Sequence, residues 1–442
     1  MSILKEVMHV GEMASGAALT VPIYRVKGKG LGPSVYIQAN MHGAEVQGNA
    51  VIFQLLELLK NTDTLGDITL VPYANPVGCN HKNGEYTLGR FDPITGVNWN
   101  RMYHYDADQI ATFAQGVEGL SDSEISTQFR DNLLAQIDQK LDHNPYGLTT
   151  GQRIAYQLQR MAHQADLVLD LHTGPISSKH LYCPEYAKSS ASYFDIPHTL
   201  LIPNVFDGAL DEATFCPWWT LQELLSANGR SFVHNKESFT VELGSQEQID
   251  LDVALEDAKS ILSYLQHKEV ITNTEYRPAD MTRYACYLKD YKAFYSPMGG
   301  MVDYLAEFGK PLAAGEPLAR ILRMDNYGFL DKGGTWMKRL LLAATLTSLL
   351  AGCTDAPEAE KAEPQKLIFK QDNQTIQIIP LYDAYQSDVD ATLKEPTENG
   401  ALFEKHVLAA KHKWIEKEKL TDTYTDRRIL EIPTDNAEEL NK

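Results

Sequence analysis

The stretch SVYIQANMHGAEVQGNAVIFQLLELL, residues 34–59, decides the fold that this sequence predicts. It begins with a short apolar run containing β-branched residues, from Ser34 to Ala39, which predicts a strand. Apolar residues then recur at helical spacing from Gly48 to Leu59. Comparable segments follow along the chain, with strands predicted at 68–74, 167–171 and 239–243 and helices at 154–165 and 251–265. This alternation is typical of an α/β sheet covered by helices.

The sequence pattern changes near residue 270, which indicates a domain boundary there. The alternating pattern ends there, so we assign residues 1–270 to a first, α/β domain. From Met281 to Leu322, short apolar runs are interrupted by Gly and Pro, as in turns between short strands. Residues 271–332 are therefore predicted to form a small all-β domain.

Residues 337–353 read MKRLLLAATLTSLLAGC and resemble a bacterial lipoprotein signal peptide. A basic start precedes an apolar run from Leu340 to Leu350, and the sequence Leu-Ala-Gly-Cys ends at Cys353, which would be lipidated. An internal core helix is the alternative, because the run is too short to span a bilayer. Since signal peptidases act at amino termini, we favour two joined reading frames, without lipidation of the joined chain. The charged tail, 354–442, indicates no function.

The charge of the chain excludes some partners. With a formal net charge of −19 and no cluster of Lys and Arg, it lacks the basic surface that nucleic acids and anionic membranes require. Five cysteines lie far apart without a C-x-x-C pair, which favours neither a disulfide scaffold nor a thiolate metal site. The start, MSILKEVMHV, has no apolar signal segment. We expect the first part of the chain in the cytoplasm, with no membrane contact unless residues 337–353 are processed separately.

Three residues are candidates for binding a metal ion. His42 and Glu45 lie three apart between the predicted strand and helix, and Gly43 allows the tight turn that lets both reach one ion. This spacing alone is weak, because most His-x-x-Glu pairs are surface or capping residues. His172 ends the apolar strand at 167–171, and open α/β sheets bind ligands at the carboxyl ends of strands. Two histidines and one carboxylate, with a position left for water, are typical of a catalytic zinc site.

Other polar residues accompany these three. Asp170 lies two residues before His172 on the same strand face, so it either orients an imidazole or caps the next loop. Glu242 ends an otherwise apolar strand, where a carboxylate either pairs with a cation or acts as a base, and we favour the base. Arg90 and Arg101 could each bind a carboxylate or stabilise an oxyanion, although a lone Arg is more often in a surface ion pair.

Together, these motifs resemble the succinylglutamate desuccinylase and aspartoacylase family, whose deacylases are related in fold to the zinc carboxypeptidases. The resemblance covers residues from 1 to about 330 and follows the family's order of motifs. It implies a zinc-carboxypeptidase-like mixed sheet flanked by helices. Two positions depart from the usual pattern: Trp99 stands where the family has Leu, and Thr173-Gly174-Pro175 follows the second histidine, as in the broader deacylase branch. The resemblance therefore leaves the substrate open.

The resemblance also implies a role for each residue. Zn²⁺, one ion per chain, would be held by the three candidate ligands and would activate water and polarise an amide carbonyl. Glu242 matches the family's general base, and Arg90 matches its arginine on the scissile carbonyl. Asn100 and Arg101 match its clamp for a substrate carboxylate. The implied reaction is hydrolysis of the amide bond of a small N-acyl amino acid or a similar molecule.

The predicted β domain resembles the family's carboxyl-terminal barrel-like domain. We expect it to be truncated at Trp336, which agrees with joined reading frames. Two other functions stay open: truncation could leave a small-molecule binding protein that holds zinc without turnover, or the product could be an envelope lipoprotein beginning at Met337. We favour the hydrolase, because a decaying gene would tend to lose some of the motif residues.

Overall fold

The computed structural model describes residues 3–272, 275–313, 315–324, 336–338, 367–371 and 374–378. Its contacts divide the chain into two compact units, Met1–Leu346 and Thr347–Lys442. In the second unit, the described residues form one hairpin of β15 (Leu367–Gln371) and β16 (Gln374–Ile378). Within the described part of the chain, no helix is long and apolar enough to cross a membrane.

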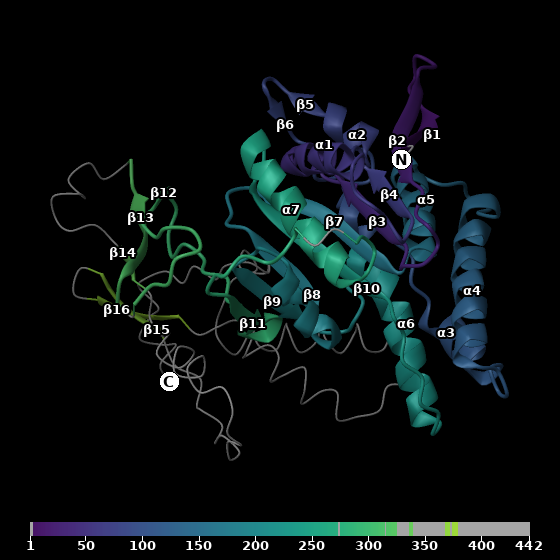
Figure 1. Cartoon of the computed structure of the whole chain (residues 1–442). Helices are drawn as coiled ribbons and strands as arrows, with labels where there is room; N and C mark the ends of the chain where they lie inside the picture. The colour runs from purple at the N-terminus through teal and green to yellow at the C-terminus, as the bar shows by residue number, and fades with distance from the viewer. Residues whose placement is uncertain are drawn as a thin grey trace. The chain divides into compact units, whose positions relative to one another are not determined.

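A mixed nine-stranded sheet forms the centre of the first unit (Figure 1). In spatial order, its strands are β1 (Ile3–Glu12), β2 (Ala18–Val26), β4 (Ile68–Val71), β3 (Val35–Ala39), β7 (Leu167–Gly174), β10 (Glu237–Ser245), β8 (His180–Pro184), β9 (His198–Ile202) and β11 (Tyr284–Tyr287). The neighbours β4, β3, β7 and β10 run parallel, whereas β2 and β8 flank them in the antiparallel sense. The carboxyl ends of β3, β7 and β10 therefore meet at one edge of the sheet, which is where open α/β sheets bind ligands.

Helices cover both faces of this sheet. On one face, α1 (Gln47–Leu59) packs beside α7 (Leu251–His267), while α5 (Thr150–Gln164) and α6 (Leu210–Ala227) cover the other (Figure 1). Successive side chains of β3 serve the two faces in turn: Ile37 packs into the core under α1 and α7, and Tyr36 into the core under α5. Because both faces are buried, the central strands are mainly apolar rather than alternating, and their few polar residues, such as Gln38 and Asp170, are buried too.

Two further helices extend the face that α6 covers. α3 (Ala107–Gln115) and α4 (Asp122–Asp142) share with α6 a smaller core in which the rings of Phe129 and Trp218 meet edge to face, with centroids 5.0 Å apart. The remaining elements of the large unit are short: α2 (Pro76–Asn80), β5 (Lys82–Asn83), β6 (Tyr86–Thr87) and the 3₁₀ helices η1 (Trp99–Arg101), η2 (Glu185–Tyr193) and η3 (Leu288–Asp290).

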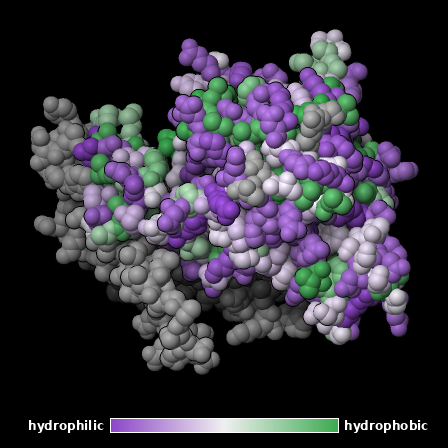
Figure 2. All heavy atoms as spheres, viewed as in Figure 1, coloured by the Kyte–Doolittle hydropathy of each residue, from purple (hydrophilic) through white to green (hydrophobic). Residues whose placement is uncertain are grey.

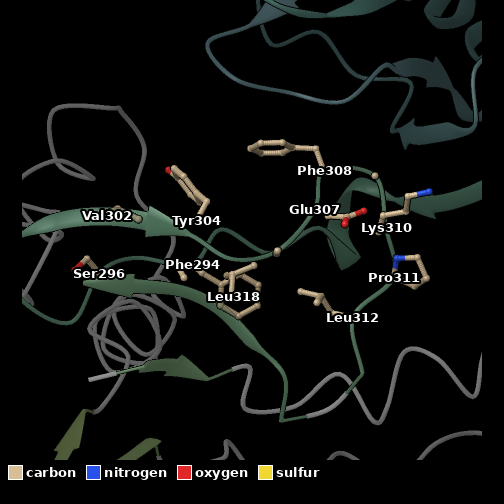
Figure 3. Close-up of a pocket in the computed structure, with 13 residues that line it drawn as sticks. Phe294, Ser296, Val302, Tyr304, Glu307, Phe308, Lys310, Pro311, Leu312 and Leu318 are labelled. Atoms are coloured by element: carbon tan, nitrogen blue, oxygen red, sulfur yellow. The ribbon is translucent and has the colours of Figure 1, made fainter. Parts of the chain in front are cut away.

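A small antiparallel sheet follows the large one in the chain. It contains β12 (Met301–Tyr304), β13 (Pro317–Leu322) and β14 (Trp336–Lys338). Beside it lies a mainly apolar hollow of about 440 Å³, to which Tyr304 and Phe308 contribute (Figure 3). Since β11 belongs to the large sheet, the described residues after 270 are shared between the two sheets. The domain boundary at 270 and the truncation at Trp336 stay predictions.

The surface shows no concentration of apolar side chains on the face that Figure 2 presents, where hydrophilic and apolar residues are interspersed. The most exposed large apolar residues, Tyr146, Ile94 and Leu31, come from separate loops. Scattered apolar residues of this kind are normal on soluble domains.

The predicted α/β sheet with flanking helices is confirmed, with differences at some ends. The strand predicted at 68–74 stops at Val71, since Pro72 follows and has no backbone N–H for a sheet hydrogen bond. The helix predicted at 154–165 starts earlier, at Thr150, because Thr149 and Gln152 form a capping box. All of the lipoprotein-like segment 337–353 except its first two residues lies outside the described residues, and of 354–442 only the β15–β16 hairpin is described.

Candidate active site

A tight loop after β3 carries the first two candidate ligands. Asn40 has a left-handed backbone, with φ of 67°, and its amide nitrogen donates to the backbone oxygens of His42 and Gly43. At Gly43, an added Cβ would lie 2.1 Å from the backbone oxygen of Gly78, so no side chain fits there. The constrained loop turns the side chains of His42 and Glu45 toward the same point.

His42, Glu45 and His172 converge at the edge of the sheet where β3 and β7 end. Nδ1 of His42 lies 2.9 Å from Oε1 of Glu45, and Nδ1 of His172 lies 2.7 Å from Oε2. One ligand atom from each residue lies within 4.8 Å of the others, and all three side chains are buried. The structure thus brings together the three residues that the sequence suggested as metal ligands.

The second ring nitrogen of His42, Nε2, faces the side-chain oxygen of Asn98. Nε2 lies 2.8 Å from Oδ1 of Asn98, and the same oxygen accepts the backbone N–H of Asn100 at 2.9 Å. The carbonyl oxygen of Asn98 and the carboxylate oxygen of Glu45 can both only accept, so each nitrogen of His42 faces an acceptor and a neutral ring can donate to just one of them. A cation bound between Nδ1 and Glu45 would favour the tautomer with the proton on Nε2, toward Asn98, and leave the Nδ1 lone pair for the cation.

Asp170 lies beside the second ring nitrogen of His172, Nε2. Its Oδ2 atom is 2.9 Å from Nε2 of His172, and both side chains are buried. The approach lies off the direction of a well-formed hydrogen bond, so the attraction is chiefly electrostatic. Burial lowers the pKa of His172, but the charges of Asp170 and Glu45 outweigh burial and raise that pKa well above its usual value. The position of Asp170 fits the alternative in which it orients the imidazole.

This donor set fits a divalent metal ion. Two imidazole nitrogens and a carboxylate face one centre, and each ring has an oxygen close to its second nitrogen, as is usual around zinc. Burial raises the pKa of Glu45, but the imidazoles of His172 and His42 lower it by more than burial raises it. The pKa of Glu45 therefore lies well below its usual value. Glu45 is therefore charged, and a buried negative charge favours a cation at this centre.

Glu242 lies next to His172, with which it is paired in the parallel register of β10 and β7. Its Oε2 atom is buried and has no hydrogen-bond partner in the described part of the chain. Burial raises the pKa of Glu242 to about 7, against the opposing charge of His172. Among the described ion pairs none involves Glu242, so the geometry suits a base better than a paired carboxylate.

Arg90 and Asn100 both reach the donor set. Nη1 of Arg90 lies 3.2 Å from Oε1 of Glu45, and 44% of the arginine side chain is exposed, so it approaches from the solvent side. The buried Asn100 places its amide nitrogen 3.4 Å from Nε2 of His172. Each of the two residues therefore contacts a different candidate ligand, Arg90 contacting Glu45 and Asn100 contacting His172.

Arg101 is exposed and does not touch the three candidate ligands. Its guanidinium donates to the backbone oxygen of Asn100 at 2.7 Å and forms no ion pair with a carboxylate among the described residues. Burial raises the pKa values of Glu212 and Tyr182. The positive charge of Arg101 lies close enough to oppose both rises in part. Arg101 is thus available to an external anion.

Three residues that contact the candidate ligands or Asp170 were not singled out from the sequence. Asn98 lies two residues before Asn100, and nothing in its local sequence indicates that it reaches a loop 56 residues earlier. Asn40 looks like an ordinary loop residue. Gln38, whose amide nitrogen donates to Oδ1 of Asp170 at 2.9 Å, could have been found from the sequence, because it is a polar side chain within a mainly apolar strand and such residues need a buried partner.

Comparisons with known proteins agree with this geometry. A family model, the succinylglutamate desuccinylase/aspartoacylase catalytic domain, matches residues 31–268. The chain belongs to this family. The family that the motifs suggested is thereby confirmed, and the matched range contains all the candidate site residues, from His42 to Glu242. Membership places the chain among deacylases, which are hydrolases of amide bonds.

Individual relatives extend the likeness. A solved structure of a succinylglutamate desuccinylase/aspartoacylase family protein from Shewanella amazonensis is 56% identical and covers 76% of this chain and 91% of its own, with a TM-score of 0.73. A second, from Shewanella frigidimarina, is 54% identical over 76% and 90% of the two chains, also with a TM-score of 0.73. The N-alpha-acetyl-L-2,4-diaminobutyric acid deacetylase of Halomonas elongata is 22% identical over 335 residues, 72% of this chain and 78% of that protein.

Proposed function

We propose that this chain is a zinc-dependent deacylase that hydrolyses the amide bond of an N-acyl amino acid or a similar small molecule with a carboxylate. The observation that carries the proposal is the convergence of two imidazole Nδ1 atoms and Glu45 on one centre, beside the unpartnered oxygen of Glu242. The Halomonas elongata relative, a deacetylase of an N-acetylated amino acid, supports this class of substrate.

One zinc ion per chain would be held by His42, Glu45 and His172. When bound, zinc supplies a Lewis acid that polarises an amide carbonyl and makes water a stronger nucleophile at neutral pH. Asn98 and Asp170 keep the two rings oriented so that both Nδ1 lone pairs stay directed at the shared centre.

The other residues would move the proton and bind the substrate. Glu242 takes a proton from the attacking water and delivers it to the leaving amine, and a pKa near neutrality suits both transfers. Arg90 is placed to donate hydrogen bonds to the oxyanion that forms on the attacked carbonyl. Asn100 and Arg101 bind the carboxylate of the substrate, which a guanidinium can hold with two hydrogen bonds.

The direct test combines metal analysis with a substrate panel. The purified full chain should retain about one zinc per chain, as expected of a three-ligand site. It should release free amino acids from N-acetyl or N-succinyl derivatives, lose this activity on chelation and regain it with zinc. Zinc retention without turnover on any member of the panel would favour the binding-protein alternative, and absence of both would contradict the proposal.

The two arginines should affect different kinetic constants. Arg101→Ala removes a contact present in both ground and transition states, so KM should rise much more than kcat falls. Arg90→Ala removes a contact made only after attack on the carbonyl, so kcat should fall by roughly a hundredfold with KM little changed. Initial rates on a substrate and on its carboxyl-amidated analogue measure both effects.

The amidated analogue decides the assignment of the clamp. Only Arg101→Ala should lose the preference for the free carboxylate, while Arg160→Ala, which removes a surface ion pair with Asp138, is the control that changes neither constant. Zinc content must also be measured, because Arg90 contacts Glu45. If both active-site variants still discriminate between the two substrates as the parent does, the carboxylate-binding part of the proposal is wrong.

A further inference from the structure

A line of buried polar side chains leads from the core of the sheet to the back of His172. Gln38 in β3 and Asp170 in β7 are partners in the parallel register, and neither side chain is exposed. Tyr36 lies two residues before Gln38, so its side chain is on the same face of β3. All three project into the core between the sheet and α5, where apolar residues surround them.

The contacts along this line are specific. The hydroxyl of Tyr36 donates to Oε1 of Gln38 at 2.9 Å, and Nε2 of Gln38 donates to Oδ1 of Asp170 at 2.9 Å. The second oxygen of Asp170 then lies 2.9 Å from Nε2 of His172. Each side chain thus fixes the orientation of the next.

Packing alone does not explain a glutamine at this position. Burying an amide and a carboxylate costs free energy unless each finds a partner, and an apolar residue would fill the same space without that cost. The contact between Asp170 and His172 is a close ion pair without the geometry of a well-formed hydrogen bond, so it attracts the carboxylate but fixes its orientation weakly. Gln38 supplies the directional hydrogen bond that Asp170 lacks on the side of His172.

We propose that Gln38 is a positioning residue, which holds Asp170 against Nε2 of His172 and thereby keeps Nδ1 of His172 directed at the metal centre. Tyr36 completes the arrangement by fixing the amide of Gln38. If that amide flipped, its oxygen would face the carboxylate of Asp170, and two acceptors would repel each other. This inference rests on the proposed function, since it assigns these residues to the candidate zinc site.

The test compares two buried glutamines. Gln38→Met keeps the volume and removes the amide, and it should weaken zinc binding by roughly tenfold to a hundredfold, the range for residues behind a metal ligand. Gln159→Met is the matched control, because Gln159 is equally buried but bonds to the backbone of His104 in the described structure. It should lower the melting temperature comparably and leave zinc affinity unchanged. Zinc affinity is measured by competition with a chelator, independently of turnover.

Tyr36→Phe provides a milder second variant should Gln38→Met fail to fold. It removes only the hydroxyl and should weaken zinc binding in the same direction but less. In the double variant, the loss should equal that of Gln38→Met alone, because the hydroxyl acts through the amide. Unchanged zinc affinity in Gln38→Met and Tyr36→Phe, or equal losses in Gln159→Met, would overturn the positioning role. Absence of zinc binding by the parent would instead refute the proposed metal site.

Discussion

Replacing His172 by alanine is expected to abolish zinc retention and reduce amide hydrolysis to background. The imidazole supplies one of three protein donors, and its Nδ1 lies 2.7 Å from Oε2 of Glu45 at the shared centre. Mutating a residue that only hydrogen-bonds to a metal ligand typically lowers metal affinity by about tenfold to a hundredfold. Removing the ligand itself should therefore lower the affinity by more than a hundredfold. Two remaining donors are too few to hold zinc through purification. Metal analysis and initial rates with added zinc measure the two effects.

The control for this variant is another buried histidine. His163 in α5 is also buried, and its Nε2 faces Gln159 rather than any candidate ligand. His163→Ala should lower stability, because it opens a cavity in the core, but should keep zinc and turnover. Stoichiometric zinc in purified His172→Ala would remove His172 from the metal site, and equal loss of zinc in His163→Ala would point to general unfolding.

The fold was predictable where local pattern and tertiary environment agree. β3 and β7 are buried on both faces, so they are short apolar runs, and α7 has apolar residues at helical spacing on the face it buries. The order of the strands was not predictable. β4 lies between β2 and β3, and β8 joins β10 across more than 50 residues of intervening chain, because side-chain packing selects those neighbours rather than local sequence.

Other elements were missed because their local signals oppose their structure. α6 contains Pro217 in its interior, and its N-cap residue, Ala209, has no side-chain hydrogen bond. The helix is stabilised instead by burial of residues such as Phe215 and Trp218. β8 is only five residues long and ends at Pro184, and contacts with β10 and β9 supply its hydrogen bonds.

The site divides in the same way. The positions of His42 and Glu45 follow from one loop, and that of His172 follows from the end of one strand, so the sequence was enough to group them. Asn98 and Gln38 act across loops and neighbouring strands, and only the folded chain shows which atoms they touch. The ligands were therefore easier to predict than the residues that orient them.

Replacing Glu242 by glutamine should preserve zinc and lower kcat by roughly a hundredfold or more, the usual scale for loss of a general base. Glu242 is not among the three candidate donors, and glutamine has nearly the same shape, so the metal centre and substrate affinity should persist. Glu237→Gln is the matched control on the same strand. Its carboxylate pairs with Lys268 and accepts from Tyr264 in the described structure, far along β10 from the donor set, so kcat should be unchanged.

The pH dependence of the parent gives the sharper form of this prediction. Since burial raises the pKa of Glu242 to about 7, and a base must be deprotonated to accept a proton, kcat/KM should rise as the pH increases through that region. A bound cation favours the carboxylate form and moves the rise to lower pH. In Glu242→Gln, the residual rate should lose this acid limb, because glutamine does not titrate. Persistence of the same limb in the variant would assign it to another group, and near-normal kcat would show that Glu242 is structural.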